Sequence, residues 1–195
     1  MATALGRGAR WGKGLGIPAE GLVERPPSPD TLFELAAAAD VVVLLAHGNV
    51  IDADGPAMRL MDATGKVATV GARGIAARSA ALAGRHLVLL SCEAGFVEAT
   101  PHRLGLLLGE LLACGPASVT AASWAVSVES ALTVGRFVVT ALLQGREPEE
   151  GAQEAIRCLL TTETDGGPLL GGRITAADQR AGRTAEARAW ATWRP

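Results

Sequence analysis

The sequence predicts an α/β fold with a mainly parallel sheet, because three short apolar segments alternate with stretches that carry helix signals. The segments 41–46, 87–90 and 118–122 are mostly apolar and lack a regular polar alternation. Strands of this kind lie inside parallel sheets that are covered on both faces. The helices between such strands supply the covering layers. We therefore expect one layered domain with its core in residues 31–160.

The segments before and after the first strand have different signals. Residues 1–30 are rich in Gly, Arg and Pro and show no periodicity, so we expect an irregular lead-in. Thr31 and Glu34 have the spacing of a capping box, which predicts a helix over residues 31–39. Turn signals separated by alternating residues predict a small hairpin within residues 50–73.

The rest of the chain alternates helices with turns. Helix-stop glycines stand at Gly84 and Gly115. The helices are expected at residues 74–84, 104–114, 129–143 and 149–160. Residues 161–195 begin with loop signals, and we expect this C-terminal extension to pack on the domain or complete it.

Composition argues against several classes of partner. The chain has 18 Lys and Arg against 20 Asp and Glu, so it lacks the basic field that holds nucleic acid or anionic membranes. Its apolar runs stay well below the roughly 18 residues that cross a bilayer, and no apolar stretch of a secretory signal follows the N-terminus. Three widely spaced Cys do not indicate a disulfide scaffold. We expect a cytoplasmic protein in a reducing compartment.

Two residues with reactive side chains follow two of the expected strands. His47 comes directly after the strand at 41–46, and Cys92 follows the strand at 87–90. The carboxyl ends of parallel strands meet at one edge of a sheet, where ligands bind. An imidazole near a thiol helps to form the reactive thiolate. Taken singly, Cys92 is also consistent with an inert core thiol, and His47 with a turn or capping residue.

The other cysteines and histidines have plainer interpretations. We expect Cys114 and Cys158 to be structural thiols, and His86 and His102 to be solvated. The spacings of these residues lack the close ligand pairs of zinc sites. The sequence therefore predicts neither a metal nor a cofactor.

The two strands and the residues that follow them resemble a known family. VVVLLAHG at residues 41–48 resembles the His-Gly strand of caspase-like cysteine peptidases, and LVLLSCEAG at 87–95 resembles the nucleophile strand of their CHAT-domain branch. That branch usually has Ser-Ala-Cys-Glu-Thr-Gly, whereas here Ser91 directly precedes Cys92 and Ala94 replaces the Thr. SWAV at 123–126 and RAWATW at the C-terminus resemble further segments of these domains.

The resemblance implies a caspase-like three-layer α/β/α sandwich and a cysteine endopeptidase that cleaves a protein substrate. Cys92 would attack the peptide carbonyl, and His47 would assist proton transfer. The backbone N–H groups of Gly48 and Cys92 would hold the oxyanion, with Gly48 allowing a sharp turn beside the substrate.

The resemblance also implies where a substrate binds. The segment from Ser123 to Val126 would pair with the substrate backbone as an added strand, and Trp124 would form a wall of a side-chain pocket. Glu129, Asp52 and Asp54 are all candidates for selecting a basic side chain before the scissile bond.

The partners implied are a protein or peptide substrate and a regulatory sensor domain or protein. The altered nucleophile loop leaves an alternative open, in which the chain is a catalytically weak or inactive CHAT-like protein-interaction module.

Overall fold

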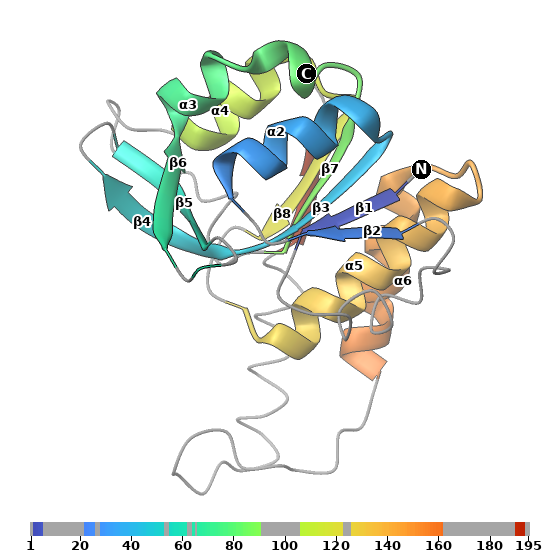
Figure 1. Ribbon diagram of the computed structural model, residues 1–195. Coiled ribbons are helices and arrows are strands. Elements are labelled where there is room, and N and C mark those ends of the chain that lie inside the picture. Colours follow the sequence, from blue (N-terminus) through green and yellow to red (C-terminus); the bar gives the residue numbers. More distant parts are fainter. Residues whose placement is uncertain are drawn as a thin grey trace, which may run out of the picture.

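The computed structural model describes the backbone in nine parts of the chain, which form a mixed α/β fold with two sheets (Figure 1). The described residues are 2–5, 22–25, 28–52, 55–61, 64, 66–90, 106–122, 126–161 and 190–193. A large sheet has six strands in the order β2-β1-β3-β7-β8-β9, and a small sheet has three in the order β4-β5-β6.

The large sheet is mainly parallel, which confirms the predicted α/β class. Every neighbouring pair in it is parallel except β8 and β9, which are antiparallel. Its strands are β1 (Ala2–Leu5), β2 (Leu22–Arg25), β3 (Val41–Leu45), β7 (His86–Leu90), β8 (Ser118–Ala122) and β9 (Trp190–Trp193). The three apolar segments picked out in the sequence are β3, β7 and β8, which are adjacent at the centre.

The expectation that residues 1–30 are irregular was wrong for two segments. Strand β1 pairs with β3 in parallel, and β2 pairs with β1. Each of these strands has only four residues. A segment this short carries little periodicity, and its strand conformation comes from pairing with the sheet rather than from local preference.

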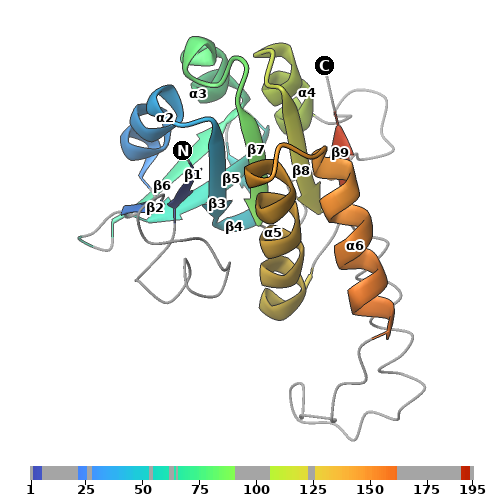
Figure 2. The same cartoon turned by 90° about the vertical axis from the view of Figure 1, so that its right-hand side faces the viewer.

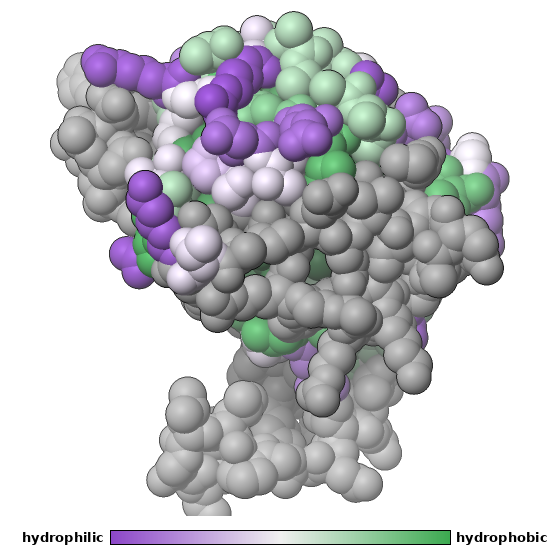
Figure 3. Space-filling view, viewed as in Figure 1, coloured by the Kyte–Doolittle hydropathy of each residue, from purple (hydrophilic) through white to green (hydrophobic). Residues whose placement is uncertain are grey.

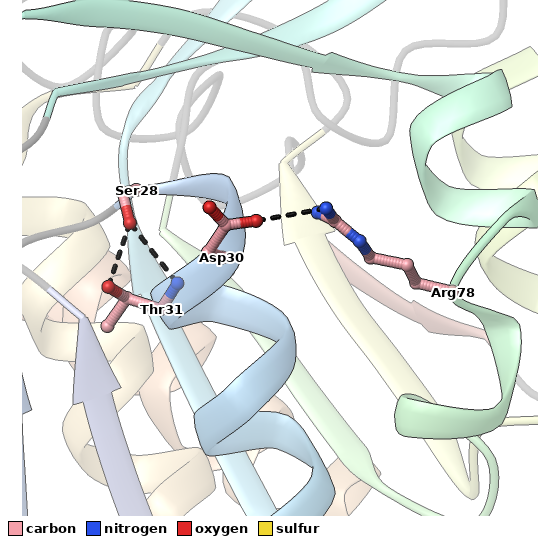
Figure 4. Close-up of polar contacts among 4 residues, drawn as sticks. All are labelled: Ser28, Asp30, Thr31 and Arg78. Atoms are coloured by element: carbon pink, nitrogen blue, oxygen red, sulfur yellow. Dashed lines mark hydrogen bonds and ion pairs between the residues drawn. The ribbon is translucent and has the colours of Figure 1, made fainter.

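Helix α2 (Pro29–Ala38) begins earlier than the predicted capping box, because Ser28 is its N-cap (Figure 4). The Ser28 Oγ accepts a hydrogen bond from the backbone N–H of Thr31 at 3.2 Å, and the two hydroxyl oxygens are 2.8 Å apart. Pro29 suits the first helical position, since its missing N–H would be unsatisfied there in any case. The expected cap at Thr31 therefore lies inside the first turn.

An exposed ion pair connects the start of α2 to the segment after α3 (Ala72–Ala76). Arg78 donates to Asp30 at 2.9 Å, as Figure 4 shows, and its guanidinium lies 5.1 Å from the centre of the Phe33 ring. Hydrophilic residues gather over this part of the surface in the space-filling view (Figure 3). Asp30 is largely exposed and Arg78 about half exposed, so the buried Phe33 contributes more to holding α2 in place.

Helices cover both faces of the large sheet (Figures 1 and 2). Alternate residues of β3 enter different cores, with Val42 and Leu44 on the side of α2 and with Val41 and Val43 on the other side. This alternation explains why β3 is apolar throughout. The first face carries α2, α3, the 3-10 helix η2 (Ser79–Ala81) and α4 (Leu106–Ala113); the second carries α5 (Val128–Leu143) and α6 (Pro148–Thr161).

The predicted helix over 74–84 is shorter and broken. Helix α3 is followed by η2 and by a turn in which Gly84 has a φ of 69°. This left-handed conformation suits glycine, so Gly84 does end the segment as its stop signal indicated. The other helices and the central strands lie within two residues of their predicted bounds.

The small sheet contains the predicted hairpin and one further strand. Strands β5 (Gly55–Met61) and β6 (Val67–Gly71) are antiparallel, and β4 (His47–Asp52) pairs with the other side of β5. Met58 and Leu60 are buried in the same core as Leu44 of β3. The small sheet is thus joined to the large one both by the chain and by a shared core.

Helices α5 and α6 approach each other closely at Gly151. A Cβ at this position would lie 2.6 Å from the carbonyl oxygen of Phe137 and 2.7 Å from the Cα of Val138. Both contacts are with backbone, which has little freedom to move away. Glycine is therefore needed at position 151 for this helix pair to pack.

Replacement of Gly151 by Ala should lower the free energy of unfolding by about 1–3 kcal/mol, because the added methyl group overpacks the α5–α6 contact. The matched control is Gly109→Ala in α4, where a Cβ would meet open space. That control should raise stability by about 0.5–1 kcal/mol, since Ala favours a helix over Gly. Urea unfolding measures the free energy of unfolding of both variants. Equal changes in Gly151→Ala and Gly109→Ala would contradict the close approach of α5 and α6.

Replacement of Ser28 by Ala should lower the free energy of unfolding by about 1 kcal/mol, because the N–H of Thr31 loses its acceptor. Glu34→Ala is the control, since the exposed Glu34 takes no part in this cap. Thermal unfolding compares the two variants. A larger loss of stability in Glu34→Ala than in Ser28→Ala would support the capping box of Thr31 and Glu34 that the sequence spacing predicted.

Candidate functional site

The carboxyl ends of β3, β7 and β8 form one edge of the large sheet. In the parallel register Leu45 of β3 is opposite Leu90 of β7, and Leu89 of β7 is opposite Ala121 of β8. All three strands therefore end at nearly the same level. The segments that follow them leave from a common edge, which in parallel sheets is where ligands bind.

His47 begins β4 only two residues after the end of β3. Its backbone pairs with that of Arg59 in β5, and the register of β4 then shifts between His47 and Val50. Such irregular pairing is frequent beside active sites, where it changes the direction of a side chain. Gly48 lies inside β4 at this shift, so the sharp turn expected at Gly48 is replaced by an irregularly paired strand.

Several residues named from the sequence lie outside the described residues. These are Cys92, Asp54, Ser123 and Trp124. The roles expected of them stay predictions. Asp52 ends β4, where its backbone is opposite that of Gly55.

Val126 and Glu129 are described, and they have different surroundings. Val126 is half-buried and packs against the core beneath α5. Glu129 is exposed in the first turn of α5, next to the N-cap Ser127, whose side chain accepts from the N–H of Ser130 at 3.1 Å. A carboxylate in a first helical turn is stabilised by the helix dipole, so Glu129 presents a negative charge to solvent at this end of α5.

Strand β8 already has a neighbour on each side. Its pairs with β9 run from Val119 opposite Trp193 to Ala122 opposite Trp190. An added substrate strand along residues 123–126 would therefore begin where the pairing with β9 ends. This finding limits how far such a strand could extend along β8.

Two polar side chains meet at the other end of the strands, where β7 and β8 begin. His86 and Ser118 are opposite each other at the starts of β7 and β8, with the His86 Nδ1 2.8 Å from the Ser118 Oγ. Ser118 is buried and His86 half-buried, so the expectation of a solvated His86 was wrong. Cross-strand pairing, which the sequence separation conceals, brings the two side chains together.

The cysteine at the end of α4 is structural, as expected. Cys114 is buried, and its thiol donates a hydrogen bond to the carbonyl oxygen of Glu110 at 3.0 Å. Burial raises the pKa of the Cys114 thiol, and the charge of Glu110 raises it further. Cys158 in α6 is half-buried. Among the residues that the structure describes, no group of three or more His, Cys, Asp or Glu side chains is arranged to hold a metal ion.

Sequence reasoning missed Arg59, whose backbone is opposite that of His47. Its neighbours Met58 and Leu60 are buried while Arg59 is exposed. The alternation of apolar and charged residues in β5 was visible in the sequence and indicated which face is solvated. The pairing with His47 was not visible, because it requires β4 to begin at His47 rather than later in the chain.

Within the described parts of the chain, none of the helices is both long enough and apolar enough to cross a membrane. Comparison with protein-family models finds no match to this chain, and comparison with curated proteins finds no significant match.

The raised pKa of Cys114 predicts slow alkylation in the folded protein. Below the ordinary pKa of a cysteine the thiol is protonated in both states. As the pH rises through the ordinary pKa of a cysteine, Cys114 ionises in the unfolded chain before it does so in the folded protein, so the free energy of unfolding should fall. Because the folded protein keeps the thiol protonated and buried, Cys114 should stay unmodified until the protein unfolds. Mass spectrometry after iodoacetamide treatment between pH 7 and 10, with and without urea, checks this. Equal labelling rates in both conditions would contradict the burial.

Proposed function

We propose that the protein is a caspase-like cysteine endopeptidase that cleaves a protein substrate with Cys92 and His47. The proposal is carried by the alignment of β3 and β7, whose last residues Leu45 and Leu90 are opposite each other. His47 follows Leu45 by two residues, and Cys92 follows Leu90 by two residues. The order of the motifs in the sequence and the equal spacing beyond aligned strands support the same pairing.

Covalent geometry limits the separation of the two residues. Consecutive Cα atoms are about 3.8 Å apart, so each of these residues is within about 7.6 Å of the end of its own strand. Neighbouring strands lie about 4.8 Å apart. A thiol and an imidazole that leave one sheet edge under these limits can come within proton-transfer distance. This supports a dyad. Of the two cysteines that the structure describes, Cys114 is buried after α4 and Cys158 is half-buried in α6.

The chemistry has two halves. The Cys92 thiolate attacks the carbonyl carbon of the scissile peptide bond, and backbone N–H groups, including that of Gly48, stabilise the negative oxygen. The carbon–nitrogen bond then breaks, and the imidazolium of His47 gives its proton to the leaving amine. Water, deprotonated by His47, hydrolyses the thioester and restores the thiol.

Substrate recognition would use the segment after β8. Residues from Ser123 to Val126 would pair with the substrate backbone beyond the end of β9, and Trp124 would line a pocket. Of the three acids that could select a basic side chain, Glu129 has the support of its described position, exposed in the first turn of α5. The sandwich architecture of caspase-like domains is part of this proposal, and helices on both faces of the sheet are consistent with it.

The second candidate is a CHAT-like interaction module with little or no activity. The observation that favours it is the departure of the nucleophile loop from the family pattern, with Ser91 directly before Cys92 and with Ala94 in place of Thr. Such a module would bind the same kind of extended peptide without cleaving it. Both candidates therefore share the peptide-binding edge and differ in the thiol chemistry.

Cleavage of a degenerate peptide library should disappear in Cys92→Ala, because no thiolate is left to attack. It should fall by about 10²–10⁴-fold in His47→Ala, which loses the proton transfer. Cys114→Ala is the matched control, since it removes a buried thiol far along the chain, and it should keep the cleavage profile of the wild type. Full activity in Cys92→Ala would overturn the proposal, and binding of peptides without cleavage by the wild type would favour the module.

A further inference from the structure

A positively charged residue is paired with the residue that the proposed function makes the proton donor. The backbone of Arg59 in β5 is directly opposite that of His47 in β4. Residues opposite each other in an antiparallel pair have Cα atoms about 4.5–5.5 Å apart. Arg59 is therefore fixed beside His47 by main-chain pairing rather than by a loop.

The side chain of Arg59 is turned to solvent and is available to a ligand. Met58 and Leu60 are buried in the core, and adjacent residues of a strand point to opposite faces. Thr69, which is opposite Arg59 in β6, is exposed as well. The side chain of Arg59 forms no hydrogen bond or ion pair with any residue that the structure describes, although its backbone is paired in the sheet.

The chemistry of the leaving group indicates which side of the scissile bond Arg59 faces. His47 protonates the leaving amine, so the amine nitrogen and the residues that follow it pass over His47. The strand next to His47 then faces the carboxyl-terminal side of the scissile bond. A guanidinium recognises a carboxylate with two parallel hydrogen bonds, which lysine cannot form.

We propose that Arg59 is a specificity-determining residue that binds an acidic side chain of the substrate on the carboxyl-terminal side of the scissile bond. This inference rests on the proposed function, because the leaving amine sets the direction. Arg59 would contact the part of the substrate after the scissile bond, whereas Glu129 is a candidate for selecting the side chain before it. The substrate class is thus a polypeptide with Asp or Glu shortly after the cleaved bond.

The test uses three fluorescein-labelled pools of degenerate peptides whose two central positions are Glu, Gln or Lys. Cleavage sites are located by mass spectrometry, and kcat/KM is compared between pools for cuts just before the fixed positions. The wild type should prefer Glu over Gln about fivefold, the factor of a strong exposed ion pair. Arg59→Glu should prefer Lys instead, and Arg59→Lys should keep a weaker preference for Glu. Added salt should reduce the preference of the wild type.

Arg136→Glu is the matched control, because it makes the same charge change on the exposed surface of α5, on the other face of the large sheet. This variant should keep the wild-type preference for Glu. Loss of the preference in Arg136→Glu as well as in Arg59→Glu would show a general effect of net charge and overturn the proposal.

A binding measurement separates this proposal from the proposed function. The same pools are titrated onto Cys92→Ala, with and without Arg59→Glu, and followed by fluorescence anisotropy. Preference for the Glu pool that depends on Arg59, without any cleavage by the wild type, would overturn the endopeptidase and support Arg59 as the acid-binding residue. Equal binding and equal cleavage of all three pools, with or without Arg59, would overturn the proposal for Arg59 alone.

Discussion

The parallel pairing of β3 with β7 is the constraint on which the rest of the structure depends. Both strands are buried on both faces, so their backbone groups have no access to water and must be paired with neighbouring strands. The pairing aligns Leu45 with Leu90, and through these ends it sets the starting points of the two segments that carry His47 and Cys92. A core requirement thus sets where the chain leaves the sheet ahead of His47 and Cys92.

The small sheet is held in place by packing against the same central strand, β3. Strand β5 buries Met58 and Leu60 beside Leu44 of β3, and the residue between them is the exposed Arg59. The packing that holds β5 against the domain therefore also holds Arg59 opposite His47. Rigid strands position a charged group more precisely than loops do. In the proposed interpretation, alternate residues of β5 thus have different tasks: Met58 and Leu60 pack in the core, and Arg59 binds the substrate.

The central strands, most helices and the hairpin were predictable because their signals are local, such as apolar runs and the glycine at position 84. Strands β1 and β2 were not, because four residues give no period and their pairing partners are distant. The cap of α2 was misplaced because Ser28 and Thr31 are both good capping residues, and Pro29 decides between them. His47 and Cys92 were found as neighbours of strand ends, whereas Arg59 depends on a register that sequence spacing does not contain.

The antiparallel β9 has a consequence for how the molecule is assembled. Val119 pairs with Trp193, so among the described residues the outer side of β8 is completed by β9, which follows every other strand in the sequence. During synthesis the other strands of the large sheet can pair while this side of β8 is still open, because β9 follows all of them in the sequence. An open strand edge is a site for intermolecular pairing. By occupying that side of β8, a strand of four residues that has no role in the proposed chemistry protects the sheet from such pairing.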